Sequence, residues 1–141
     1  MVASLMKWLP EPSEKDIDDA RNLSRAKIDV GTLVRLSSVG WNAGGLRRLA
    51  RYAASIRTSA EPKALERSNL QLVRVLMFCN ATATHLVDAV VGTALRHGLL
   101  LDVMLAEYEE PEAFLSRNQA TISTFAPDIA IVAFDVHAFA L

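Results

Sequence analysis

An apolar run at residues 72–78 constrains the fold of this chain more than any other part of the sequence. The run is rich in residues that favour strands and is interrupted only by Arg74, which is typical of a strand buried on both faces. Small and polar residues at 79–84 predict a tight turn, after which Thr84 is well placed to cap a helix. A buried strand, a short turn and a helix predict the opening unit of an open parallel α/β sheet.

The rest of the chain continues this alternation of strands and helices. The spacing of apolar residues predicts a helix at 84–97 that ends at Gly98, a second strand at 99–106, one or two helices at 112–125 and a third strand at 129–134. Because crossovers between parallel strands are right-handed, this order predicts an α/β fold with a three-layer parallel sheet. We expect its strands to lie in the order 2-1-3.

A helical segment is predicted ahead of the first strand. Ser13 is expected to begin a capped helix with an acidic first turn. A short helix is predicted at 30–39, and clearer helical spacing of apolar residues predicts another at 46–56. Trp8, which precedes them, is expected to anchor the start of the chain against the domain. We therefore divide the chain into a helical lead-in at 1–66 and an α/β domain at 67–141.

The third predicted strand is expected to leave an apolar edge without a partner. Three strands are also few for such a sheet, which commonly has about five or more. We expect the α/β domain to be incomplete and to continue beyond Leu141 in a longer protein. The alternatives are that another chain pairs with this edge or that the protein forms a homo-oligomer.

Composition and charge exclude several classes of function. Hydrophobic residues make up 51% of the chain and charged residues 22%, which favours a packed core over disorder. The net charge of -1 gives no reason to expect nucleic acid or an anionic membrane as partner. No apolar run approaches the roughly 18 residues of a membrane span, and the first residues lack the apolar core of a signal peptide. With a single cysteine, we expect a cytoplasmic protein.

Several polar residues are predicted to line one crevice at the carboxyl ends of strands 1 and 3. In open α/β sheets, ligands bind beside the strand ends at which the strand order reverses. The candidate ligand-binding residues are Asn80, Thr82, Thr84, His85, Asp135 and His137. A structural alternative stays open and is favoured, in which Asn80 and Thr82 satisfy turn amides and Thr84 caps a helix. His85 would then be a neutral, hydrogen-bonded histidine.

The sequence contains no motif that predicts a metal or cofactor. The three histidines and Cys79 lack the spacing of metal ligands, and the turn after the first strand has no glycine with which to cradle a phosphate. Cys79 ends a buried strand and is expected to be an inert, small apolar residue. We expect no cofactor in this chain and no assigned catalytic residue. Asp135 and His137 are the candidates for an acid–base pair.

Several segments, taken in order, resemble the N-terminal domain of FkbH-like proteins, which are members of the haloacid-dehalogenase (HAD) superfamily. The central stretch is VLMFCNAT at 75–82, followed by His85-Leu86 and by LRHG at 95–98. Tyr108, FAPDIAIV at 125–132 and the earlier WLPEP at 8–12 complete the pattern. That domain is similar in fold to SGNH hydrolases, so the resemblance implies a flavodoxin-like and SGNH-like parallel sheet.

The same resemblance implies that this chain is not an esterase. In SGNH hydrolases a Gly-Asp-Ser motif after the first strand carries the nucleophile, and the aligned residues here are Cys79-Asn80-Ala81. Ala81 therefore stands at the nucleophile position. The oxyanion glycine has no counterpart, Asp135-Val136-His137 stands where the oxyanion asparagine is expected, and the catalytic Asp-x-x-His would lie beyond Leu141.

Full-length FkbH-like proteins continue into a HAD domain with an Asp-x-Asp-x-Thr motif, which this sequence lacks. The resemblance implies a parent enzyme, a HAD-type phosphatase or glyceryl transferase, that would load a glyceryl group onto an acyl carrier protein in polyketide-type biosynthesis. Mg²⁺ would be expected in the absent HAD domain. This chain would serve scaffolding, docking or gating, with the HAD domain and the carrier protein as partners. The alternatives are a small stand-alone hydrolase or acyltransferase that uses Asp135, His137 and Cys79, and a free-standing binding module.

Overall fold

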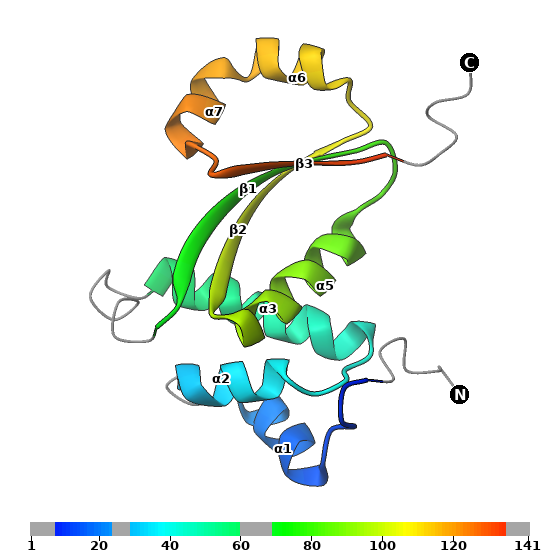
Figure 1. Ribbon diagram of the computed structural model, residues 1–141, viewed down its shortest axis with the longest axis vertical. Helices are drawn as coiled ribbons and strands as arrows, with labels where there is room; N and C mark the ends of the chain where they lie inside the picture. The colour runs from blue at the N-terminus through cyan, green and yellow to red at the C-terminus, as the bar shows by residue number, and fades with distance from the viewer. Residues whose placement is uncertain (1–7, 24–28, 60–68, 135–141) are drawn as a thin grey trace.

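The computed structural model of the protein describes residues 8–23, 29–59 and 69–134 (Figure 1). The helices ahead of the sheet are α1 (Glu14–Asn22), α2 (Val30–Ser37) and α3 (Ala43–Ser59). The chain then continues with β1 (Gln71–Cys79), α5 (Thr84–Ala94), the short 3₁₀ turn η1 (Leu95–His97), β2 (Leu99–Glu107), α6 (Pro111–Arg117), α7 (Gln119–Phe125) and β3 (Ile129–Ala133). None of the helices in these described ranges is long and apolar enough to cross a membrane.

The strands that the structure describes form one parallel sheet in the order β2-β1-β3. The predicted α/β fold, its strand order and the helical segment ahead of the sheet are confirmed. β1 pairs with β2 along its whole length, whereas β3 pairs only with the second half of β1, from Val75 opposite Ile129 to Cys79 opposite Ala133. Because β1 is central, all its residues from Val75 to Cys79 are buried.

Helices cover the two faces of the sheet unequally. In Figure 1, α3 and α5 lie against one face with α1 and α2 beyond them, and α6 and α7 cover the other face. The larger core cluster combines residues of α2, α3, α5 and the sheet, among them the fully buried Leu33, Leu49 and Leu100. On the other face, Phe78 and Phe114 meet edge to face at 5.7 Å between ring centroids, but neither α6 nor α7 has a buried residue. The α6–α7 layer is therefore the thinner one.

The helix α5 packs closely on α3 at Gly92. A Cβ atom at Gly92 would lie 2.8 Å from the carbonyl oxygen of Leu46, which is closer than a real Cβ contact allows. A residue without a side chain is thus required for the two helix backbones to approach this closely.

Two details differ from the helix ends that the sequence predicts. Thr84 does not cap α5: it is the first residue of the helix, and Ala83 occupies the cap position without a side-chain hydrogen bond. The predicted helix at 84–97 gives way to the 3₁₀ turn η1 after Ala94, and Gly98 ends that turn in the left-handed conformation, as expected, at φ 72°. Trp8 packs over Arg96 of the same turn, with the guanidinium carbon 5.0 Å from the ring centroid.

Candidate functional site

The turn after β1 and the end of β2 form the candidate site. The chain leaves the central strand β1 towards β2 on one side and later reaches β3 on the other. The carboxyl ends of β1 and β3 therefore flank the point at which the strand order reverses, where open α/β sheets bind ligands. Residues 80–83 connect β1 to α5 at this edge, and Glu107, the last residue of β2, lies opposite Cys79.

The Glu107 carboxylate occupies the turn after β1. Its Oε1 atom accepts a hydrogen bond from the backbone N–H of Ala83 at 2.7 Å, and the Thr84 hydroxyl lies 3.5 Å from the same oxygen. Thr84 does not cap α5 because the helix begins one residue earlier, with the Val87 N–H donating to the carbonyl of Ala83; the carboxylate from the neighbouring strand binds the Ala83 N–H at this start. A charged acceptor binds such an N–H more strongly than a hydroxyl does.

Tyr108 closes over the same turn from the end of β2. Its hydroxyl lies 2.6 Å from the hydroxyl of Thr82, and its backbone N–H donates to the carbonyl of Cys79 at 2.8 Å. Tyr108 adopts the left-handed backbone region at φ 57°, which costs a residue with a side chain about 1–2 kcal/mol. The side chain is nevertheless 67% exposed, so the strained backbone presents a phenol and a threonine hydroxyl together at the surface.

Cys79 lies beneath this turn and is not available as a nucleophile. The residue is buried in a cluster with Met77 and Ala83. Burial raises the pKa of its thiol, and the negative charge of Glu107 raises that pKa further. Since the thiolate is the reactive form, both effects keep the side chain in its inert, protonated state, as the sequence led us to expect.

His85 is held by α3 rather than by the turn. The Nη2 atom of Arg47 lies 2.7 Å from Nδ1 of His85, while Nε of the same arginine donates to Asp88 at 3.1 Å. A guanidinium only donates hydrogen bonds, so Nδ1 of His85 is the acceptor in this contact. Arg47 thus ties the first turn of α5 to α3.

The structure brings together only part of the predicted crevice. Thr82 contacts the Tyr108 hydroxyl, and Thr84 contacts the Glu107 carboxylate. Asn80 lies half-buried in the same turn. Asp135 and His137 fall outside the described residues, so their pairing stays a prediction. Within the described part of the chain, no group of three His, Cys, Asp or Glu side chains is arranged to hold a metal ion.

Sequence reasoning missed Glu107 and the site role of Tyr108. The sequence predicts that the second strand ends at residue 106, whereas β2 includes Glu107 and Tyr108 follows it directly. The register of β1 against β2 is what places both residues beside the turn. Register between strands that are distant in the sequence leaves little local signal.

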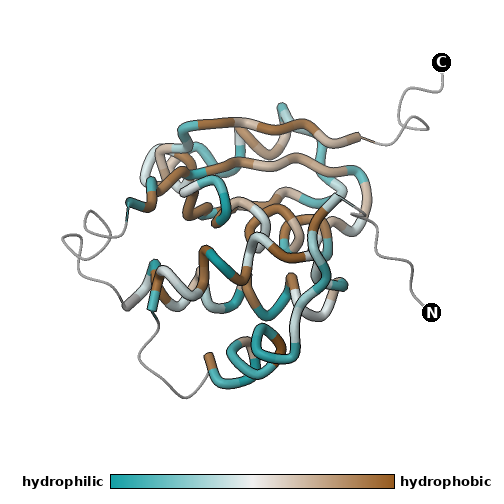
Figure 2. The backbone as a smooth tube through the Cα atoms, turned by 60° about the horizontal axis from the view of Figure 1, so that its bottom comes forward, coloured by the Kyte–Doolittle hydropathy of each residue, from teal (hydrophilic) through white to brown (hydrophobic). Residues whose placement is uncertain are grey.

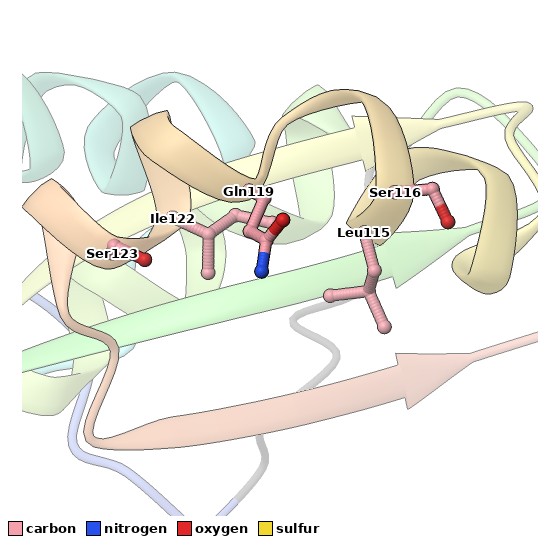
Figure 3. Close-up of a pocket in the computed structure, with 5 residues that line it drawn as sticks. All are labelled: Leu115, Ser116, Gln119, Ile122 and Ser123. Carbon is pink, nitrogen blue, oxygen red and sulfur yellow. The ribbon is translucent and has the colours of Figure 1, made fainter.

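A groove lies away from this site, on the α6–α7 layer. It has a volume of about 360 Å³ and is lined by Leu115, Ser116, Gln119, Ile122 and Ser123. Figure 3 shows the side chains of Leu115 and Ile122 extending from the two helices on the side of the strands. The lining combines two apolar side chains with three uncharged polar residues, and Gln119 lies between Leu115 and Ile122 in Figure 3.

Comparison of the chain with protein families, with curated proteins and with solved structures found no match.

Proposed function

We propose that this chain is a non-catalytic α/β module that acts by docking, as the N-terminal SGNH-like module of a FkbH-like HAD-family enzyme. In that setting a separate HAD domain handles the glyceryl group, and this module helps to engage the acyl carrier protein that receives it. The observation that carries the proposal is the turn after β1, where Glu107 holds the Ala83 N–H and where Ala81 occupies the position that the resemblance assigns to the nucleophile.

Acyl transfer needs chemistry that this turn opposes. A developing oxyanion is stabilised by free, preorganised N–H donors, usually the largest single contribution to such catalysis. Here the Ala83 N–H is already bound to a carboxylate, whose negative charge would also repel an oxyanion at the same place. The buried Cys79 thiol offers no replacement nucleophile because its pKa is raised.

The exposed surface of the turn is suited to recognition instead. The hydroxyls of Thr82 and Tyr108 form one paired group, and Tyr108 is 67% exposed. Tyrosine combines a large apolar surface with a hydrogen-bonding tip, which is why it is enriched at protein interfaces. We propose that this pair contacts the carrier protein or its phosphopantetheine arm.

The test is a titration of the ¹⁵N-labelled chain with a phosphopantetheinylated acyl carrier protein, followed by NMR. We expect amide shifts in residues 80–85 and at Tyr108. Tyr108→Phe should weaken binding by roughly fivefold, equivalent to about 1 kcal/mol for one hydrogen bond. Thr124→Val is the matched control, because that hydroxyl on α7 only donates to the carbonyl of Ala120.

Two results would contradict the proposal. One is the absence of shifts around the turn at millimolar carrier protein. The other is turnover of p-nitrophenyl acetate by the purified chain that is lost in His137→Ala, which would favour the stand-alone hydrolase instead.

A further inference from the structure

The side chain of Arg96 contains two enclosed nitrogens without a hydrogen-bond partner. Nε and Nη1 of its guanidinium are shielded from solvent and bond to no acceptor, and among the described residues they are the only buried side-chain nitrogens or oxygens in this state. A guanidinium stays charged in proteins and only donates hydrogen bonds. Leaving its N–H groups buried and unpaired costs free energy, so an oxygen acceptor is expected beside Arg96.

Other arginines that join α3 to its neighbours have a carboxylate partner, and Arg96 has none. Arg47 pairs with Asp88 at 3.1 Å, and Arg57 pairs with Asp102 at 2.5 Å. No carboxylate in the described part of the chain lies within ion-pair distance of Arg96. The turn η1 follows the carboxyl end of α5, where helix carbonyls favour a cation. None of these carbonyls accepts from Nε or Nη1, so the helix end accounts for the charge but not for the two N–H groups.

Trp8 stabilises the charge of Arg96 without supplying an acceptor. The guanidinium carbon lies over the indole ring, 5.0 Å from its centroid, which is a favourable contact for a cation, but the ring has no oxygen. Trp8 is 70% exposed, and the stretch at 8–13 that carries it is held by a hydrogen bond from the Gly40 N–H to the Pro10 carbonyl at 2.8 Å. Figures 1 and 2 show this stretch at the border of the helical layer. Arg96 thus lies beside an exposed aromatic ring at the molecular surface.

The third nitrogen, Nη2, gives an oxyanion a way to reach the enclosed pair. Arg96 as a whole is only half-buried, and Nη2 is not among the enclosed atoms. In a planar guanidinium, Nη2 shares one edge with Nε and another edge with Nη1. A carboxylate or phosphate group that binds either edge through two oxygens therefore engages Nη2 and one enclosed nitrogen together. This two-bond arrangement is the one that arginine favours for such anions.

We propose that Arg96 and Trp8 form a binding site for an oxyanion, a carboxylate or a phosphate group, which the guanidinium holds through two parallel hydrogen bonds. The anion supplies the acceptor that the described residues do not provide, and the indole ring borders it. The site lies at the opposite end of the sheet from the turn at Thr82 and Tyr108, because η1 comes directly before β2 whereas that turn follows β1. This inference is therefore independent of the proposed function.

The test is NMR of the full ¹⁵N-labelled chain, titrated with sodium phosphate and, in a second arm, with sodium acetate. Sodium chloride keeps the ionic strength constant, so that general screening of charges does not change during the titration. We expect saturable shifts of the Nε–H signal of Arg96 and of the indole N–H signal of Trp8, which Arg96→Gln and Trp8→Phe identify. Saturation in either arm supports the site, and the tighter arm distinguishes a phosphate from a carboxylate ligand.

Variants of the arginine separate a specific site from a general effect of charge. Arg96→Gln should abolish the saturable shift of Trp8. Arg48→Gln is the matched control, because it removes the same charge from an exposed arginine of α3, and it should leave binding unchanged. Arg96→Lys keeps the charge but loses the planar fork, so it should weaken binding at least about tenfold. Arg96→Lys also decides the question if circular dichroism shows that Arg96→Gln does not fold.

Three results would overturn the inference. The first is a shift that grows without saturating in both arms, as expected if solvent alone satisfies the two nitrogens. The second is a saturable shift of Trp8 that persists in Arg96→Gln. The third is an Arg96→Lys chain that binds the anion as tightly as the parent chain does, because the fork would then play no part.

Discussion

The thiol of Cys79 and the carboxylate of Glu107 show how one pair of opposed residues decides the chemistry of the turn after β1. Glu107 binds the backbone N–H of Ala83, and its charge adds to burial in keeping the Cys79 thiol protonated. Both effects oppose nucleophilic chemistry at the carboxyl end of β1, where parallel α/β sheets often have their functional site. What the turn keeps at the surface is the hydroxyl pair of Thr82 and Tyr108.

Cys79 should therefore react slowly with a disulfide reagent such as DTNB. Since it is the single cysteine of the chain, the reaction reports on this site alone. At pH 8 a raised pKa leaves a smaller fraction of thiolate, and burial limits access, so we expect the folded chain to react at least about tenfold more slowly than the chain unfolded in urea. Equal rates in the two conditions would show that Cys79 is accessible and ionised.

Among the elements, the contact between α3 and α5 depends on Gly92. In Gly92→Ala the new methyl group would meet the Leu46 carbonyl oxygen at 2.8 Å, so the helices must separate. We expect a loss of about 1–3 kcal/mol in the free energy of unfolding, measured with urea. Gly44→Ala is the control, because its Cβ would meet only the Asn42 side chain at 3.4 Å. A Gly92→Ala chain as stable as the parent would contradict the close packing.

The helices α1 and α2 are joined through Asp16, which should make their pairing sensitive to acid. Hydrogen bonds from the Ser13 hydroxyl and backbone N–H lower the pKa of Asp16, and Arg35 of α2 lowers it further. A carboxyl group whose pKa is lower in the folded state stabilises the fold above its unfolded pKa of about 3.9 and loses that contribution as the pH falls.

Asp16→Asn should therefore lower the free energy of unfolding at pH 7, by about 1 kcal/mol, and flatten its decline between about pH 5 and 3. Urea titrations at several pH values measure both effects. Asp18→Asn is the control, because Asp18 is exposed on the same helix and pairs only with Arg21, also exposed, at 3.4 Å. The role assigned to Asp16 would be wrong if the two variants had the same pH dependence.

For the whole molecule, the fold was predictable from the sequence to a greater extent than the site. The apolar run of β1 and the helical spacing of α5 are local patterns that follow directly from burial. Gly98 ends the helical segment in the structure, as the sequence predicts. The site depends on contacts between distant residues. Glu107 reaches Ala83, and Arg47 reaches His85, only because strand register and helix packing bring them together.

The contact between Asp128 and Arg74 bears on the order in which the sheet forms: the Arg74 N–H donates to the Asp128 carboxylate at 2.8 Å, and the Asp128 N–H donates to the Arg74 carbonyl at 2.9 Å. It joins residues 54 positions apart, whereas β1 and β2 pair at much shorter separation, as between Val75 and Val103. Each doubling of a closed loop costs about 0.6 kcal/mol of chain entropy, and distant contacts form slowly. β2 is thus favoured to join β1 first, and β3 is added last, guided into register by Asp128.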